Sequence, residues 1–189
     1  WQPALGLLAV MREAVFVPNV ITYSAAISAC EKGGQWRKAF GILAVMREAG
    51  LVPNVIAYNA AVSACEKGEQ WQQALGLLAV MREAELVPNV ISYGVAISAC
   101  EKGHQWQQAL GFLGVMQQTD SMPDVITYNA AISACEKGEQ WQQALGLLEV
   151  MQQTAALPDL FSFAAVISAC EKGQQWKQAL GLLAVIQQF

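Results

Sequence analysis

Apolar residues recur along the chain at the spacing of an amphipathic helix. Within residues 55–67 they fall three or four positions apart, at Val55, Tyr58, Val62 and Cys65. This spacing gathers side chains on one face of a helix, which then packs against a core. The pattern therefore predicts a helix over 55–67 with one buried stripe.

A second helix is predicted to follow the first after a tight turn. Asn54, which follows Pro53, is suited to cap the first helix, and Gly68 is a common residue just past a helix end. The next apolar pattern begins almost at once at Trp71, so the two helices must run antiparallel. One of its stripes contains Trp71, Ala74, Leu75, Leu78 and Met81, and the other contains Leu77, Val80 and Ala84. A helix that is apolar on two sides is sandwiched between neighbours, as stacked repeats require.

The helical hairpin repeats along the chain with one period. Three residue types return every 35 residues: Trp at 1, 36, 71, 106, 141 and 176, Cys at 30, 65, 100, 135 and 170, and Pro at 18, 53, 88, 123 and 158. Such a fixed period is typical of stacked supersecondary units. We therefore predict an all-α fold, a right-handed α–α superhelix (solenoid) of 35-residue helix–turn–helix repeats with eleven helices. The expected single array, 1–189, comprises a partial repeat over 1–19, full repeats over 20–54, 55–89, 90–124 and 125–159, and a last, truncated repeat over 160–189.

A further stripe on the first helix of each repeat is not explained by packing within the hairpin. In residues 55–67 it runs through Ile56, Asn59, Ser63 and Lys67, again three or four positions apart. The equivalent stripes are Ile21, Ser24, Ser28, Lys32; Ile91, Gly94, Ser98, Lys102; Ile126, Asn129, Ser133, Lys137; and Phe161, Ala164, Ser168, Lys172. Stacking would align them into an apolar ridge, a row of small polar groups and a row of ammonium groups.

Two interpretations of these stripes are open. The apolar side chains could sandwich bases, the short polar groups could bond to base edges, and the lysines could approach the phosphates of a single strand. Alternatively, Ile56 and its equivalents pack the junction between repeats. The lysines would then occupy the last helical turn because cations are favoured at the negative end of the helix dipole.

The overall charge is unfavourable for a polyanionic ligand. The net charge is −4 and the isoelectric point about 5.0, whereas nucleic-acid-binding domains commonly carry a basic patch. A glutamate directly precedes each recurring lysine, as in Glu66-Lys67. Because adjacent helical residues point about 100° apart, we still expect a locally positive surface along the lysine row. Although 54% of residues are hydrophobic, apolar runs reach only eight residues, as in Ala74–Met81, so no membrane span of about 20 residues is expected.

Neither catalysis nor metal binding is predicted. His104 is the only histidine and occupies a variable turn position, where we expect no structural demand on the residue. The cysteines are expected to be buried and unpaired, because neighbouring repeats lie roughly 10 Å apart and a disulfide reaches ~7 Å. Gly76 lies inside the second helix of its repeat, as do its equivalents in the other repeats, and these glycines are expected to allow close packing of neighbouring helices. We therefore expect no cofactor, no metal, no small-molecule substrate and no enzymatic activity.

The repeated string resembles the pentatricopeptide repeat family. The matching residues are Pro-Asn/Asp-Val-Ile-Thr/Ser-Tyr-Asn, then Ile-Ser-Ala-Cys-Glu-Lys-Gly, then Trp-x-x-Ala-Leu-x-Leu-Leu-x-x-Met, across essentially the whole chain. The resemblance implies a single-stranded RNA-binding protein of a plastid or mitochondrion that reads about one base per repeat. Its role would be in RNA processing, stability or translation. Because the chain opens at Trp1 within a motif, we expect a piece of a longer protein whose targeting segment lies upstream.

The resemblance also implies which residues read each base. They are the residue after the aromatic in the first helix and the Asn or Asp after the repeat's terminal proline. Four pairs result: Ser24 with Asn54, Asn59 with Asn89, Gly94 with Asp124, and Asn129 with Asp159. The first implies adenine, the second a pyrimidine with cytosine favoured, and the fourth uracil. Gly94 and Ala164 offer no hydrogen-bonding side chain, and the N-terminal repeat would face the 5′ side.

The remaining RNA contacts follow from the same resemblance. The base-sandwiching residues would be Ile21, Ile56, Ile91, Ile126 and Phe161, and the phosphate-contacting residues would be Lys32, Lys67, Lys102, Lys137 and Lys172. Stacking contributes roughly 1–3 kcal/mol per base, so four bases imply a dissociation constant between micromolar and millimolar. The rival function is a protein-interaction scaffold of a larger organellar complex. A peptide groove of the tetratricopeptide kind is disfavoured by the 35-residue period.

Overall fold

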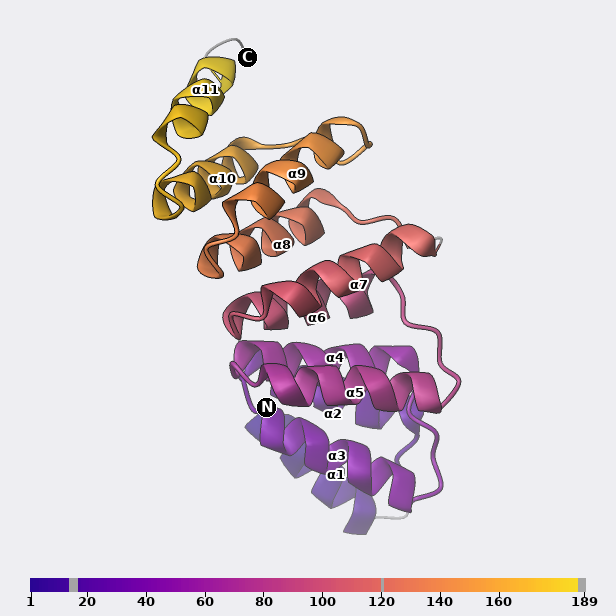
Figure 1. Ribbon diagram of the computed structural model, residues 1–189. Coiled ribbons are helices and arrows are strands. Elements are labelled where there is room, and N and C mark those ends of the chain that lie inside the picture. Colours follow the sequence, from indigo (N-terminus) through magenta and orange to yellow (C-terminus); the bar gives the residue numbers. More distant parts are fainter. Residues whose placement is uncertain (14–16, 120, 187–189) are drawn as a thin grey trace. The chain divides into compact units, whose positions relative to one another are not determined.

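The computed structural model describes residues 1–13, 17–119 and 121–186, and these residues form helices, turns and loops without a strand (Figure 1). Eleven helices lie in this part of the chain: α1 (Gln2–Glu13), α2 (Val20–Lys32), α3 (Trp36–Glu48), α4 (Val55–Lys67), α5 (Trp71–Glu83), α6 (Val90–Lys102), α7 (Trp106–Gln118), α8 (Val125–Lys137), α9 (Trp141–Gln152), α10 (Leu160–Lys172) and α11 (Trp176–Ile186). The predicted all-α fold of helical hairpins is confirmed.

The helices gather into two compact units, Trp1–Ala99 and Cys100–Phe189, whose boundary lies within α6. In the first unit, α4 packs against α2, α3 and α5. In the second unit, α10 packs in the same way against α8, α9 and α11. The first helix of a hairpin thus contacts its own partner and both helices of the preceding hairpin.

Each first helix begins where an Asn or Asp side chain accepts a backbone hydrogen bond. Asn54 Oδ1 accepts from the backbone N–H of Ala57 at 3.0 Å, which confirms the predicted cap. Asn19, Asp124 and Asp159 cap α2, α8 and α10 in the same way. Such a cap stabilises a helix by about 1 kcal/mol, because it satisfies an amide that has no partner within the helix.

The predicted core stripe is buried. The side chains of Val62 and Cys65 are inaccessible and Tyr58 is almost so. The Tyr58 hydroxyl accepts a hydrogen bond from Arg47 Nη2 at 2.8 Å, so the polar end of the buried ring has a partner. All five cysteines are buried and unpaired, as predicted. Burial raises the pKa of the Cys65, Cys100 and Cys135 thiols to about 12.

The glycine after the first helix ends that helix as predicted, and it also serves the packing between repeats. Gly68 follows the end of α4, but its φ is −87°, a value open to any residue. A Cβ built on Gly68 would lie 2.5 Å from Cδ1 of Trp36, which comes from the preceding repeat. Gly138 and Gly173 receive Trp106 and Trp141 in the same way. The missing side chain therefore makes room for an indole between repeats.

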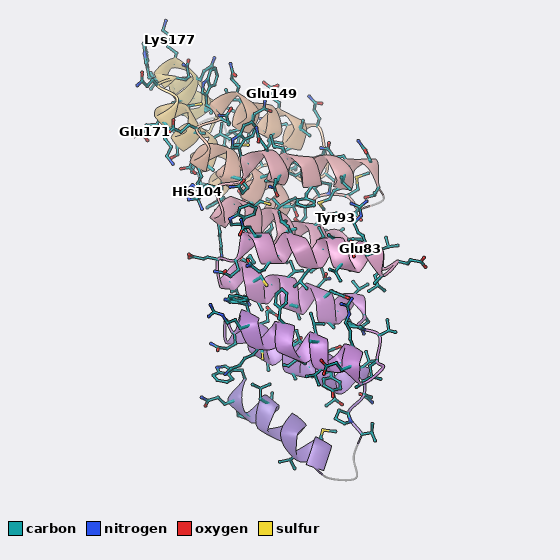
Figure 2. All side chains as sticks on the ribbon, turned by 60° about the horizontal axis from the view of Figure 1, so that its bottom comes forward. Glu83, Tyr93, His104, Glu149, Glu171 and Lys177 are labelled. Atoms are coloured by element: carbon teal, nitrogen blue, oxygen red, sulfur yellow. The ribbon has the colours of Figure 1, made fainter. Side chains whose placement is uncertain are left out.

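The left-handed residue of this turn comes one position later and is usually not glycine. Glu69, His104, Glu139 and Gln174 have φ values of 56–57°, and Gly34 has 63°. His104, labelled in Figure 2, thus adopts a backbone conformation that L-residues rarely take. The expectation that this position makes no structural demand is wrong.

The glycine inside the second helix does not serve helix packing. A Cβ built on Gly41, Gly76 or Gly146 would meet no atom within 4 Å. The prediction that the missing side chain lets neighbouring helices approach closely is therefore wrong, because these glycines face open space.

Candidate nucleic-acid interface

The apolar ridge lies on the surface of both units. The side chains of Ile21, Ile56, Ile91, Ile126 and Phe161 are between 58% and 78% exposed. The predicted exposure is confirmed, and the alternative in which these residues pack the junction between repeats is wrong. Their contact with bases stays a prediction.

Asn59 and Asn89 are joined by a hydrogen bond although a whole helix separates them in sequence. Asn59 Nδ2 donates to Asn89 Oδ1 at 3.2 Å. Ser92, which is inaccessible, holds both residues. Its hydroxyl donates to Asn59 Oδ1 at 2.6 Å and its backbone N–H donates to Asn89 Oδ1 at 3.0 Å. The second predicted pair is thus brought together and oriented by the following repeat.

Asn129 and Asp159 form the same arrangement in the second unit. Asn129 Nδ2 donates to Asp159 Oδ1 at 3.2 Å, and the Ser162 hydroxyl donates to Asn129 Oδ1 at 2.6 Å. The Ser162 backbone N–H donates to Asp159 Oδ1 at 2.8 Å. This backbone hydrogen bond is the largest cause that lowers the pKa of Asp159 below its ordinary value, followed by the Ser162 and Asn129 side-chain bonds. The Asp159 carboxylate is therefore ionised at neutral pH and can only accept hydrogen bonds.

These bonds determine what each pair can offer to a ligand. Asn89 Oδ1 already accepts from the Ser92 backbone N–H and from Asn59 Nδ2, which leaves the Asn89 Nδ2 donors and the second Asn59 Nδ2 hydrogen for a ligand. The Asn59–Asn89 pair thus offers donors. The Asn129–Asp159 pair instead offers an amide hydrogen of Asn129 and lone pairs of the Asp159 carboxylate.

A pocket of about 280 Å³ opens beside Asn59 and Asn89 in the first unit. Ile56 and Ile91, ridge residues of two successive repeats, line it together with these amides and Glu31. Apolar side chains beside oriented amides suit a flat ring with a polar edge.

The other two predicted pairs are less favourably arranged. The Ser24 hydroxyl donates to the backbone carbonyl of Val20 at 2.7 Å, so its hydrogen points into its own helix. Asn54 and Asp124 cap their helices as Asn89 and Asp159 do, so the difference lies in the partner residue. Gly94 has no side chain and belongs to the first unit, whereas Asp124 belongs to the second.

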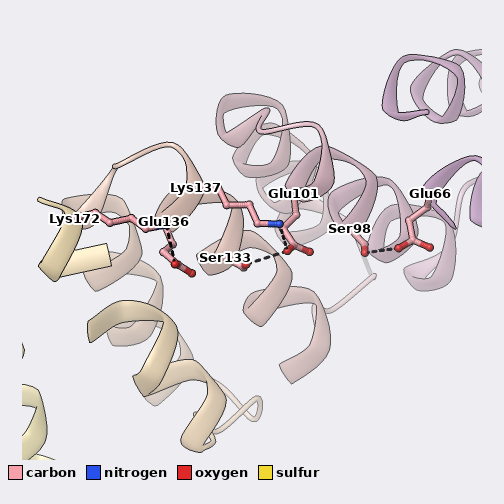
Figure 3. A network of polar contacts seen from close by, with 7 residues as sticks. All are labelled: Glu66, Ser98, Glu101, Ser133, Glu136, Lys137 and Lys172. Atoms are coloured by element: carbon pink, nitrogen blue, oxygen red, sulfur yellow. Dashed lines mark hydrogen bonds and ion pairs between the residues drawn. The ribbon is translucent and has the colours of Figure 1, made fainter. Parts of the chain in front are cut away.

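The lysine row is paired with carboxylates rather than forming a positive surface. Each pair joins a lysine to the glutamate 36 residues earlier, in the preceding repeat. The Nζ–Oε1 distances are 2.7 Å for Lys67–Glu31, 2.8 Å for Lys137–Glu101 and 3.0 Å for Lys172–Glu136. Figure 3 shows the second and third of these pairs. The expected locally positive surface is wrong for these three lysines. Lys32 is exposed.

The same carboxylates bind the serines of the polar row. Ser63 Oγ donates to Glu31 Oε1 at 3.1 Å, Ser133 to Glu101 at 3.0 Å and Ser168 to Glu136 at 2.8 Å, and Ser98 donates to Glu66 at 3.1 Å. Glutamate therefore accepts from two positions of the next repeat.

The sequence interpretation assigned these glutamates to another surface and overlooked Ser92 and Ser162. The spacing of three between Asp159 and Ser162, which form a capping box, is the signal that could have found the two serines.

Other chemistry finds no support in the described part of the chain. Among those residues, no group of three or more His, Cys, Asp and Glu side chains could hold a metal ion. Nor does any described helix have the length and apolar character needed to cross a bilayer.

Comparisons with known proteins point to one family. Residues 6–68 match the pentatricopeptide repeat domain, and residues 53–102 and 123–172 match the PPR repeat family. No curated protein sequence matches the chain.

Solved structures share the fold at low sequence identity. The chain is similar to pentatricopeptide repeat protein PPR10 from maize, with 24% identity and a TM-score of 0.77, over 99% of this chain and 27% of that chain. For PPR10 in complex with an 18-nt psaJ RNA element, the identity is 22% and the TM-score 0.74, over 96% of this chain and 26% of that chain. The PPR domain of Arabidopsis thaliana protein-only RNase P 1, in complex with tRNA, gives 14% and 0.76, over 86% of each chain. The chain thus spans about a quarter of the length of PPR10.

Proposed function

The chain belongs to the pentatricopeptide repeat family, and on that premise we propose that it binds single-stranded RNA along the face that carries the exposed ridge. About one base per repeat would enter between successive ridge residues and meet the polar pair beside them. The observation that carries the proposal is the pocket of about 280 Å³ lined by Ile56, Ile91, Asn59 and Asn89. PPR10 from maize, which has the same fold, has been solved in complex with RNA.

The donors and acceptors of the two joined pairs complement different pyrimidines. Cytosine presents acceptors at N3 and O2, which fits the donor-only pair Asn59–Asn89. Uracil presents an N3–H donor between carbonyl acceptors, which fits the Asp159 carboxylate beside the Asn129 amide. The hydrogen bonds around Ser92 and Ser162 thus support the cytosine and uracil assignments.

The proposal extends to a role in RNA processing, stability or translation in a plastid or mitochondrion, without catalysis by this chain. The family resemblance supports these finer statements.

The test is a base-specific switch of binding. Fluorescence anisotropy would compare oligoribonucleotides that contain 5′-ACNU-3′ with ones in which the fourth base is cytosine, at low salt. Asp159→Asn creates a donor-only pair, so preference should move from uracil to cytosine by about tenfold, the effect of about 1.4 kcal/mol from an unmatched polar group. Asn89→Asp should produce the reverse change at the second base.

The matched control is Asp124→Asn. It makes the same chemical change at the cap of α8, but the partner position is Gly94, which has no side chain. Preference at the fourth base should stay unchanged. The proposal fails if wild-type protein retains no oligoribonucleotide at millimolar concentration, or if Asp159→Asn leaves the base preference as it was.

A scaffold function is favoured by a different observation. The residue before each repeat's proline is apolar and at least 67% exposed, at Val17, Val52, Val87, Met122 and Leu157. Exposed apolar side chains in a row commonly mark a protein contact surface. If the chain is a scaffold, replacing Val52 and Val87 by Ser should release a protein partner that co-purifies with it, while its RNA affinity stays the same.

A further inference from the structure

The carboxylates of the interface lie behind the lysines that an incoming phosphate would approach. Lys67, Lys137 and Lys172 each contact one glutamate oxygen at 2.7–3.0 Å. The lysine side chains keep 31–43% of their surface exposed, and the glutamates keep only 19–23%. A ligand from solvent therefore reaches the ammonium groups first and finds a carboxylate behind each of them.

The glutamates are held in place independently of the lysines. The oxygen that accepts from Lys67, Lys137 or Lys172 also accepts from a serine hydroxyl, at 2.8–3.1 Å. Glu31 in addition lines the pocket between Ile56 and Ile91. These carboxylates thus belong to the proposed RNA face rather than to a distant surface.

We propose that Glu31, Glu101 and Glu136 limit the RNA affinity of the chain by holding the interface lysines in ion pairs that phosphates must compete for. The inference rests on the proposed RNA binding and specifies its electrostatic control. A phosphate that shares the lysine meets the repulsion of a nearby carboxylate, and one that displaces the carboxylate must break an ion pair. Exposed ion pairs have a modest strength, which corresponds to about twofold in affinity per site and about tenfold for three sites.

The decisive variant replaces all three glutamates by glutamine. Gln is isosteric and its Oε1 still accepts from the serine hydroxyl, so the contacts between repeats are kept while the competing charge is removed. RNA affinity should rise about tenfold at low salt. The salt dependence should also steepen, by about 0.7 per released lysine in log affinity against log salt.

A matched control separates this local effect from the change in net charge. Glu48, Glu83 and Glu149 are exposed residues of α3, α5 and α9, and two of them are labelled in Figure 2. Replacing these three by glutamine changes the net charge by the same three units. Affinity should then rise much less than in the interface variant, with an unchanged salt slope. Helicity and the thermal midpoint of both variants verify that the fold is kept.

A third variant tests the lysines themselves. In the background of the three Glu→Gln changes, Lys67→Gln, Lys137→Gln and Lys172→Gln should together remove the gain in affinity and the steeper salt slope. In the wild-type background the same lysine changes should have a smaller effect, because those lysines are already neutralised.

Each outcome decides the matter. Equal gains in the interface and control variants would mean a general charge effect, and an unchanged or reduced affinity in the interface variant would mean that the carboxylates only join the repeats. Both results overturn the inference and leave RNA binding intact if Asp159→Asn still switches base preference. Loss of all RNA retention, in every variant, would instead refute the proposed function.

Discussion

Three glycines inside the second helices, Gly41, Gly76 and Gly146, allow a quantitative test of this fold. Each lies within a helix, and a Cβ added to it would meet no atom within 4 Å. Glycine in a helix interior is less favourable than alanine by about 0.8–1.0 kcal/mol, because it loses more backbone freedom on folding. Since nothing surrounds the added methyl group, no steric term opposes this gain. We expect each Gly→Ala change to raise the free energy of unfolding by about 1 kcal/mol.

The three changes should act nearly independently because they lie in different helices and share no neighbour at the added methyl. The triple variant should gain about 3 kcal/mol, which moves the thermal midpoint upward by roughly 6–12 °C for a chain of this size. Urea titration followed by circular dichroism measures the free energy of unfolding of each variant. A shift in the urea midpoint reports a change in stability where the slope of the transition stays the same.

The opposite result is expected when the same change is made at Gly68. Its φ of −87° suits alanine, so backbone conformation favours neither residue. The new Cβ would lie 2.5 Å from Cδ1 of Trp36, and the indole must move. We expect a loss of about 1–3 kcal/mol. If Gly76→Ala destabilises the protein, or Gly68→Ala does not, the assignment of open space to one glycine and an indole to the other is refuted.

Three further changes test other parts of the structure. Glu139→Gly should stabilise the protein by up to about 1 kcal/mol, because the left-handed φ of 57° is unfavourable for glutamate. Glu149→Gly, at an exposed position inside α9, should instead destabilise it in the same urea titration. Burial raises the pKa of Cys65 to about 12, above the value of about 8.5 in an unfolded chain. The stabilisation from the protonated thiol is therefore present below pH 8.5 and is lost as pH rises toward 12, so the urea midpoint should fall between pH 8 and pH 10. Cys65→Ala should weaken this pH dependence. A urea midpoint that does not change with pH would contradict the prediction. Ser92→Ala removes the donor to Asn59 Oδ1 and should reduce the preference for cytosine at the second base about fivefold, the effect of about 1 kcal/mol, with helicity unchanged.

The hairpins and the exposed ridge could be predicted from the sequence because both depend on positions within one helix. The stripe that contains Tyr58 and Val62 and the stripe that starts at Ile56 lie on different faces of α4, and the 3.6-residue period alone separates them. The cap at Asn54 is equally local, since its partner is the amide three residues later. Such features need no knowledge of how neighbouring repeats are offset.

Apart from the left-handed turn position at His104 and its equivalents, the features that the sequence interpretation missed depend on that offset. Gly68 meets Trp36 of the preceding repeat, and Lys67 meets Glu31, a separation of one repeat plus one residue. The helical wheel correctly turns Glu66 away from Lys67, but it does not show that the glutamate of one repeat faces the lysine of the next. The open space beside Gly76 likewise depends on where the neighbouring helices lie.

The proposed base sites combine both kinds of feature, which explains why their residues could be named but not their orientation. Asn59 and Asn89 come from one repeat, and Ser92, which turns both amides, comes from the next. The donor-only character of this pair is therefore a property of two adjacent repeats rather than of the two residues alone. The first pair, Ser24 and Asn54, lacks this hydroxyl because Ala57 stands at the position equivalent to Ser92. The Ser24 hydroxyl bonds to its own helix instead. Ala57→Ser alone should not produce a pair like Asn59–Asn89, because the Ser24 side chain is too short to accept from the new hydroxyl as Asn59 does. The double variant Ala57→Ser, Ser24→Asn should create a second repeat that prefers cytosine.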